Sequence, residues 1–374
     1  MTEAAAAPTD QQTKGGRLTE WLMLYAGSVA AALFLTAVLV ETTGGEWRPV
    51  MSALLDGSLR RPGRWGETLG TMAPLLLVAL GTVISSKAGL INIGQEGQLA
   101  IGAAFAAYFG LLIGGPGPIN VVIVLIFGVV GGAFWAGIAG ILRFRRSVPE
   151  VLSTLLMVTI ASQAVAYALG KPWLLLASEA NRGNRNQVSE QLGADNRIPR
   201  PDIFGNEFPI SVYMALILAV AVAFALKSTT WGFRLRMLGQ NPTAARRVGV
   251  SQGRYGMAAL MVSGGFAGLA GAAMLAGGGF AFGNYQIVPG FSGNVGWTGL
   301  LVALVASNRA VAAIPAAFVF ASLRTGSGFV ASTGVESKIT DVMQGLLVLA
   351  LLIPPAVMFI RDRRRARAAT MART

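Results

Sequence analysis

The sequence contains no cysteine and no histidine among its 374 residues. Without cysteine the chain has no disulfides and no thiol chemistry, and the two absences together remove the usual protein ligands of haem, zinc and copper. Charged residues are also scarce, at 13% against about 25% in a typical soluble domain. The composition predicts a membrane protein, and we expect no cofactor and no metal centre.

Hydrophobic residues make up 53% of the chain and gather in long runs. A helix needs about 20 mostly apolar residues to cross the hydrocarbon core of a bilayer. We therefore predict an all-α, polytopic membrane bundle of about ten transmembrane helices, with broken or re-entrant segments. The expected spans are residues 21–40, 67–85, 97–114, 119–141, 149–169, 210–227, 255–276, 295–307, 310–326 and 340–360. One transmembrane domain would cover residues 21–360, between a disordered tail at 1–20 and a basic tail at 361–374.

The net charge of +13 is explained by topology better than by nucleic-acid binding, so no nucleic-acid partner is expected. An even number of spans puts both termini on one side of the membrane. Most of the 30 Lys and Arg residues then fall on that side, which the positive-inside rule identifies as the cytoplasm. The basic residues between 48 and 64 oppose this assignment. The longest external segment, 171–209, is predicted to be a lid or a docking surface.

A polar patch interrupts the apolar sequence KAGLINIGQEGQLAIGAAFAAYFG at 87–110. Polar groups at membrane depth are costly unless they face protein or water. One interpretation is a transport pathway, because amides donate and accept hydrogen bonds and so suit uncharged ligands such as a ribose or a nucleobase edge. The alternative is that the same groups hold helices together. The patch consists of Asn92, Gln95, Glu96 and Gln98.

A second candidate for the pathway is the uncharged segment FAFGNYQIVPGFSGNVGW at 280–297. Aromatic faces with amides nearby can stack on a base and read its edge. The alternative is an aromatic belt at the membrane interface. Its glycine-punctuated end, 289–296, weakly resembles 89–97, which would place the two on opposite halves of a repeat-built bundle. The residues in question are Asn284, Tyr285, Ser292, Asn294 and Trp297.

The segment GQNPTAARRVGVSQG at 239–253 predicts a short cytoplasmic helix over 243–250. Asn241 would cap its start, with Pro242 in the first turn, and Gly249 would end it. Such a helix can seat in a groove of a partner protein through Thr243, Ala244, Ala245, Arg246 and Arg247, or it can lie on lipid phosphates. In PEVLST at 149–154, Glu150, Ser153 and Thr154 open a span, and the favoured explanation is simply a helix start.

These blocks resemble a known family. TAARRVG has the A-A-x-x-x-G spacing of the cytoplasmic coupling loop in ABC importer permeases, although Thr243 replaces the usual Glu. The sequences GLINIGQEGQLAIGA, VPEVLSTLLM, TTWGFRLRMLGQNPTAARRVGV, VSGGFAGLAGA and FSGNVGWTGLLVALV are similar to successive blocks of the permease family for simple sugars, nucleosides and branched-chain amino acids, and especially of its nucleoside-type branch. One block departs from the family pattern: Ala306–Ala310 replaces an ALLG-NNP turn.

The resemblance implies a permease subunit that imports nucleosides, or simple sugars as the second choice. It also implies cytoplasmic ATPase subunits, a second permease copy or paralogue, and an extracytoplasmic substrate-binding protein. The sequence has no G-x-x-x-x-G-K-[ST] phosphate loop, so a separate subunit would have to bind ATP. An ion-coupled secondary transporter is the rival interpretation, but few buried carboxylates are available to carry a coupling ion. A membrane enzyme would need a nucleophile–base pair that no spacing suggests.

Overall fold

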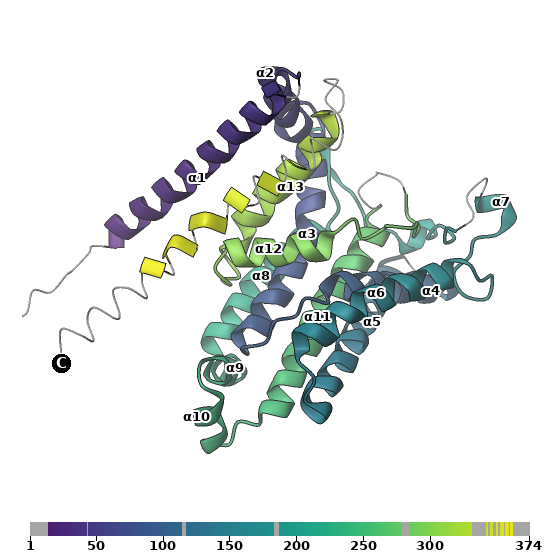
Figure 1. The fold of residues 1–374 in the computed structure, drawn as a ribbon. Coiled ribbons are helices and arrows are strands. Elements are labelled where there is room, and N and C mark those ends of the chain that lie inside the picture. Colours follow the sequence, from purple (N-terminus) through teal and green to yellow (C-terminus); the bar gives the residue numbers. More distant parts are fainter. Residues whose placement is uncertain are drawn as a thin grey trace, which may run out of the picture. The chain divides into compact units, whose positions relative to one another are not determined.

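The computed structural model describes residues 14–42, 44–113, 117–182, 187–278 and 284–330, together with scattered positions between 342 and 361. The chain divides into two compact units, residues 1–49 with 334–374 and residues 50–333. The first unit contains α1 (Lys14–Thr42), which covers the expected span at 21–40 (Figure 1). The expected span at 340–360 and the two predicted tails lie largely outside the described residues.

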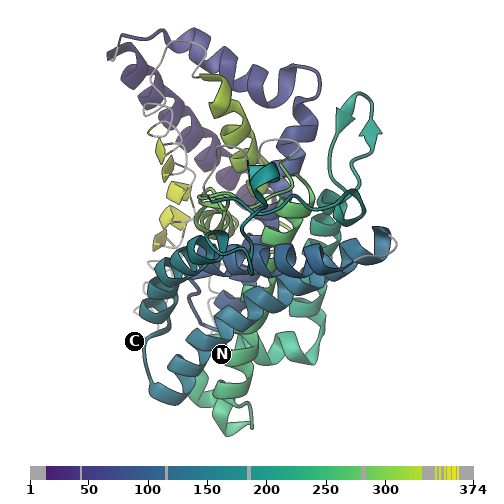
Figure 2. The same cartoon turned by 90° about the vertical axis from the view of Figure 1, so that its right-hand side faces the viewer.

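The described residues of the second unit are mostly helical and include one two-stranded hairpin. The hairpin pairs Asp202 with Glu207 and Ile203 with Asn206 in antiparallel register. It lies at the opposite end of the unit from α9 and α10, as the rotated view shows (Figure 2). The described elements of this unit begin with α2 (Trp47–Leu55), whose residues before Val50 belong to the first unit. The others are η1 (Asp56–Arg60), α3 (Arg64–Lys87), α4 (Gln95–Leu112), α5 (Gly117–Arg146), α6 (Glu150–Leu169), α7 (Glu179–Arg182), η2 (Ala194–Asn196), β1 (Asp202–Ile203), β2 (Asn206–Glu207), α8 (Ser211–Ser228), α9 (Thr230–Gln240), α10 (Pro242–Arg247), α11 (Gln252–Ala276), α12 (Val295–Val305) and α13 (Ala313–Val330).

Six of the described helices, α3, α5, α6, α8, α11 and α13, are long and apolar enough to cross a membrane. The described residues thus contain six helices of this kind, whereas the sequence predicts about ten spans. The predicted span 295–307 is α12, whose 11 residues are too few to cross the hydrocarbon core. The predicted span 97–114 is the 18-residue α4, whose first turn carries Gln95, Glu96 and Gln98 of the polar patch. Both elements follow irregular backbone, as expected for broken helices.

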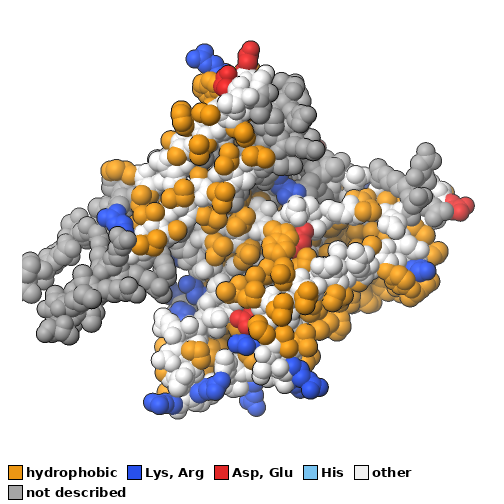
Figure 3. Space-filling view, in the orientation of Figure 1, with side chains coloured by type: hydrophobic (Ala, Val, Ile, Leu, Met, Phe, Trp, Pro, Cys, Tyr) orange, Lys and Arg blue, Asp and Glu red, His pale blue; other side chains and the backbone are white. Residues whose placement is uncertain are grey.

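The core of the second unit forms around α3 and α11. In the most apolar window of each helix, 89% of the α3 residues and 72% of the α11 residues are buried, against 28% in α5 and 22% in α6. The outer helices instead expose large apolar side chains, including Phe134, Ile160, Ile217 and Phe224, and such side chains cover much of the surface in Figure 3. A buried centre and an apolar outer surface are expected of a bundle whose solvent is lipid.

Glycines allow α4, α5 and α11 to approach one another closely. A side chain at Gly264 or Gly268 would collide with the α5 backbone at Gly132 or Gly128. A side chain at Gly102 of α4 would collide with the backbone of both Gly268 and Gly128. The α11 glycines 264 and 268 are four residues apart, and so are the α5 glycines 128 and 132. This small-xxx-small spacing lets membrane helices pack backbone to backbone. Close packing thus accounts for the glycines at 264 and 268.

Candidate functional site

The helix α4 begins inside the second unit, well away from the end of α3. The side-chain amide of Gln95 donates a hydrogen bond of 3.0 Å to the carbonyl of Val78. Val78 lies roughly 13 Å along the helix axis from Lys87, where α3 ends, at about 1.5 Å per residue. The seven residues between the two helices, 88–94, therefore return part of the way into the bundle before α4 starts.

Glu96 links this start to the start of α12. One carboxylate oxygen accepts a hydrogen bond of 3.1 Å from the backbone N–H of Asn294, and the other accepts one of 2.6 Å from Gly296. Glu96 is only 8% exposed. Hydrogen bonds to an ionised group are strong, and the N-terminus of a helix attracts negative charge. The partner that a buried carboxylate requires is therefore the N-terminus of α12.

The backbone around this junction is specialised for close approach. A side chain at Gly296 would collide with the backbone of Glu96. Asn294 has a φ of 65°, in the left-handed region that asparagine tolerates better than most residues. The two glycine-punctuated segments that resemble each other in sequence, 89–97 and 289–296, thus meet directly at the starts of α4 and α12.

The three amides of the polar patch are buried and bonded to one another or to neighbouring helices. Asn92 and Gln98 exchange reciprocal hydrogen bonds of 2.9 and 3.0 Å. Asn92 also donates to the Ser263 hydroxyl of α11, and Gln95 donates to the same oxygen at 3.3 Å. The hydroxyl of Thr82 donates to Gln95 at 2.6 Å. In this conformation the amides join α3, α4 and α11 to one another. They therefore hold helices together, which is the alternative interpretation to a transport pathway. Their contact with substrate remains a prediction.

The residues expected in the second candidate segment are spread over its length. Asn284 and Asn294 are exposed, whereas Ser292 and Trp297 are half-buried. The ring of Tyr285 lies against the guanidinium of Arg197, 4.1 Å from its carbon to the ring centre. Tyr285 therefore makes a cation–π contact with protein in this conformation. Phe280 and Phe282, the first aromatics of the segment, lie outside the described residues.

A strip of backbone hydrogen bonds joins this segment to the long polar segment before α8. Ser189 donates to the carbonyl of Ile287 at 3.0 Å, and Leu192 donates to that of Tyr285 at 2.8 Å. Beside the strip, Glu190 accepts bonds from the Ser178 backbone and the Asn181 amide. Although burial raises the pKa of Glu190, these hydrogen bonds outweigh it and the pKa falls below its usual value. The segment expected to be a lid is thus fixed to the chain that leads into α12.

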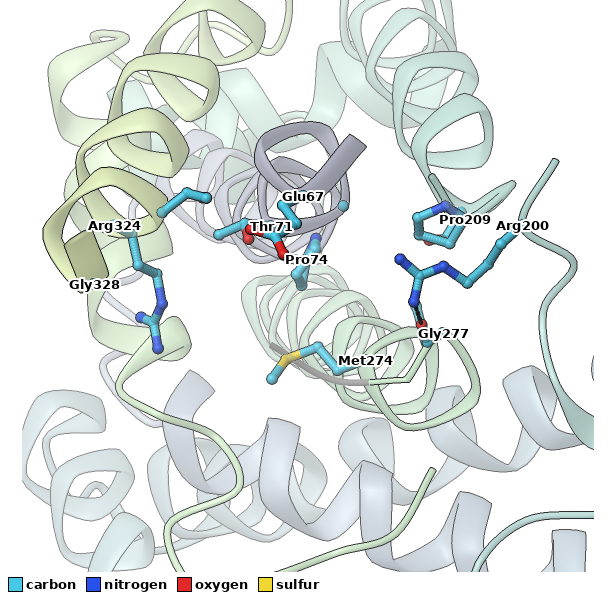
Figure 4. A pocket seen from close by; sticks show the side chains of 13 residues that line it. Glu67, Thr71, Pro74, Arg200, Pro209, Met274, Gly277, Arg324 and Gly328 are labelled. Atoms are coloured by element: carbon cyan, nitrogen blue, oxygen red, sulfur yellow. Dashed lines mark hydrogen bonds between the residues drawn. The ribbon is translucent and has the colours of Figure 1, made fainter. Parts of the chain in front are cut away.

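A cavity of about 210 Å³ lies between α3, α11, α13 and the segment that leads into α8 (Figure 4). Arg324 of α13 and Arg200 line it from opposite sides (Figure 4). Arg200 also donates to the carbonyl of Gly277 at 3.3 Å. Glu96 is close enough to Arg324 to contribute a favourable charge interaction.

The sequence interpretation did not select Arg200 or Arg324 as site residues. A signal for Arg324 was present, because it lies inside the predicted span 310–326, and a charged residue within a span is a functional candidate by default. Arg200 lies in a polar segment rich in proline and had no comparable signal. Only the fold brings it opposite Arg324, since the two belong to different segments of the chain.

The short helices α9 and α10 stand at the other end of the unit. The side chain of Asn241 accepts hydrogen bonds from the backbone of Thr243 and Ala244 at 3.1 and 3.0 Å, and Pro242 occupies the first position of α10. Gly249 follows the helix with a φ of 82°. The predicted cap, proline and terminating glycine are all observed. The helix is shorter than the predicted 243–250, because it ends at Arg247.

The surface of α10 differs from the prediction at one residue. Ala245 is fully buried and packs with Leu238 and Val250 of the same chain. It therefore fixes α10 to the neighbouring residues and is not part of the exposed surface. The exposed surface consists of Thr243, Ala244, Arg246 and Arg247, with Gly249 beside them. Arg246 also donates to the side chain of Gln252. The basic residues near this end are visible at the bottom of Figure 3.

The residues of PEVLST serve the start of α6. Glu150 pairs with Arg143 of α5 at 3.0 Å. The hydroxyls of Ser153 and Thr154 donate to carbonyls of the preceding turn, among them Glu150. These contacts agree with the favoured explanation, a helix start.

Comparison with known proteins places these features in context. Residues 66–352 match the family described as the permease component of branched-chain amino acid transport systems. The guanosine ABC transporter permease of Bacillus subtilis is 29% identical over 91% of this chain and 96% of its own length. A glucose ABC transporter permease of Haloferax volcanii is 31% identical over 76% of this chain and 75% of its own. A nucleoside ABC transporter permease of Lactococcus lactis is 28% identical over 77% and 79%. No solved structure gives a significant match.

Proposed function

We propose that this chain, which belongs to the family of branched-chain amino acid transport system permease components, is the membrane-spanning subunit of an ATP-driven importer of nucleosides. It is a multi-pass protein of the cell membrane, and it falls in the nucleoside and simple-sugar branch of the ABC permeases. The chain supplies the transport path and leaves ATP hydrolysis to other subunits.

The proposal includes an arrangement in the membrane and a set of partners. Both termini and the α9–α10 pair face the cytoplasm, and the permease domain covers residues 21–360 between two short tails. Cytoplasmic ATPase subunits bind the exposed surface of α10. A second permease, identical or related, completes the path, and an external binding protein delivers the substrate. The basic character of the α9–α10 end supports this orientation.

The single observation that carries the transport role is the junction at Glu96. Two broken elements, α4 and α12, begin within the bundle and meet at one buried carboxylate. Membrane proteins tolerate irregular backbone at this depth where it is buried in protein or lines a cavity, and discontinuous helices form the substrate path in many transporters. We place the path beside this junction, along Asn92, Gln95, Glu96, Gln98 and Asn294, with Asn284, Tyr285, Ser292 and Trp297 on the outer approach.

Nucleosides are favoured as substrate because the guanosine permease of Bacillus subtilis aligns with nearly the whole chain. The arginines of the cavity suit a ligand with many hydrogen-bond acceptors. A simple sugar is the second candidate, since the Haloferax volcanii relative that matches at 31% identity is named for glucose. Branched-chain amino acids and ion-coupled transport are the remaining alternatives.

Reconstitution of the whole transporter tests the proposal. The permease would be placed in liposomes with its ATPase subunits, its partner permease and its binding protein, and uptake of labelled guanosine, uridine and glucose would be measured. We expect nucleoside uptake that requires ATP and persists when an uncoupler dissipates the ion gradients. ADP in place of ATP is the matched control. Uptake of glucose alone would reassign the substrate, and uptake abolished by the uncoupler would indicate a secondary transporter.

A further inference from the structure

The cavity beside the Glu96 junction has a distinctive set of hydrogen-bonding groups. Arg200 and Arg324 contribute guanidiniums from opposite walls (Figure 4). A guanidinium has five N–H donors and no acceptor, and it is planar. A ligand held between the two must therefore present acceptors, such as carbonyl oxygens or ring nitrogens. The bond from Arg200 to the Gly277 carbonyl fixes one of these groups at the wall.

A carboxylate lines the same cavity. Glu67 of α3 belongs to the lining and pairs with Arg64 of its own helix. An ionised carboxylate is an acceptor only, so it suits N–H donors and repels a fully anionic ligand. Arginines together with a carboxylate therefore favour a neutral ligand that carries carbonyl acceptors next to N–H donors.

The remaining walls are apolar apart from the hydroxyl residues Thr71, Ser211 and Thr325. Pro74, Pro209 and Met274 line the cavity between the charged groups (Figure 4). Flat, polarisable rings pack well against such carbon surfaces and against a methionine thioether. Ligand sites commonly combine mostly apolar walls with a few polar groups that fix orientation. A planar heterocycle fits this description, because its two faces are apolar and its edge carries the hydrogen-bonding groups.

We propose that this cavity binds the base of the nucleoside on its way through the permease and favours bases with a ring carbonyl beside an N–H, such as guanine, hypoxanthine and uracil. Adenine has an amino donor in place of the ring carbonyl, so it offers the arginines ring nitrogens alone, whereas guanine and hypoxanthine offer a carbonyl oxygen and a ring nitrogen side by side to a guanidinium fork. This inference rests on the proposed nucleoside transport and adds a discrimination among bases within the permease itself.

The test compares guanosine and adenosine in the reconstituted transporter. The binding protein is supplied at a concentration that saturates it with either nucleoside, so that its own selectivity no longer contributes. We expect the wild-type permease to carry guanosine faster than adenosine. The substitution Arg324→Gln should lower the guanosine rate about tenfold, the scale of one bidentate base contact, and change the adenosine rate much less. Arg200→Gln should act in the same direction.

Two further variants keep the result interpretable. Arg324→Lys keeps the charge but loses the planar fork, so it should also lower guanosine uptake selectively. Arg60→Gln, at an arginine of η1 that does not line the cavity, should leave both rates unchanged. Equal losses for both nucleosides in all three cavity variants, at normal membrane abundance, would overturn the base-recognition proposal. A wild-type transporter that carries neither nucleoside would instead refute the proposed function.

Discussion

The carboxylate of Glu96 accepts a hydrogen bond of 2.6 Å from the backbone N–H of Gly296, a residue 200 positions further along the chain. This bond and its companion from Asn294 join the first turn of α4 to the first turn of α12. The contact is possible only because Gly296 has no side chain. One carboxylate thereby compensates the N-terminus of a half-helix that would otherwise leave backbone donors unpaired at depth.

The first prediction concerns this contact. Gly296→Ala should destabilise the permease by about 2 kcal/mol or more, because the new methyl group collides with the Glu96 backbone and disrupts hydrogen bonds to a charged group. Thermal unfolding of the purified protein in detergent measures the effect. Gly253→Ala is the matched control, since a methyl group there meets nothing within 4 Å and alanine favours the helix. Equal unfolding temperatures for the two variants would contradict the close approach.

A second prediction separates a pathway role from a structural one. Gln95→Leu removes the amide that bonds to Val78, Ser263 and Thr82, so both stability and transport should fall. Asn294→Gly removes an exposed amide while preserving the left-handed backbone. It should lower the transport rate and leave unfolding temperature, assembly and binding-protein affinity unchanged. If Asn294→Gly transports at the wild-type rate, its side chain takes no part in the path.

A third prediction concerns coupling to ATP hydrolysis. Arg246→Glu should reverse the charge of the exposed α10 surface, and Gly249→Trp should strain a φ of 82°. Each should reduce ATP-driven transport at least tenfold and leave basal ATPase activity in place. Gly205→Trp is the matched control, because Gly205 also has a positive φ, of 75°, but lies in the hairpin at the opposite end. Wild-type transport and normal recovery of the ATPase with both α10 variants would exclude α10 as the coupling element.

A fourth prediction fixes the topology. The chain has no cysteine, so single cysteines can be introduced without background. Asp202→Cys in the hairpin should react with an impermeant thiol reagent added outside cells, and Gln252→Cys only after the membrane is permeabilised. Asp202 is exposed, so a thiol at this position is accessible to the reagent. The opposite labelling pattern would reverse the orientation and the assignment of both partner surfaces.

Local signals determined much of this protein. Apolar runs produced the helices, because only structures that satisfy their own backbone are stable in hydrocarbon. Asn241, Pro242 and Gly249 set the limits of α10 to within a few residues, since capping depends on neighbours in sequence. The polar residues at 92–98 were identifiable because such groups are conspicuous among apolar ones. Their number and spacing could not show whether they bind substrate or one another.

The tertiary structure decided which groups meet. No local pattern links Glu96 to Gly296 or Arg200 to Arg324, because each pair comes together only when several helices pack. The short α12 could not be recognised as a half-helix from its apolar sequence. Hydropathy indicates that a residue favours an apolar environment, but it does not indicate where in the membrane a helix begins or ends. Ala245 was assigned to a surface that the packing of Leu238 and Val250 keeps buried. Partner choice among buried polar groups depends on three-dimensional proximity, and that is fixed by the close packing of glycine-rich helices rather than by sequence spacing.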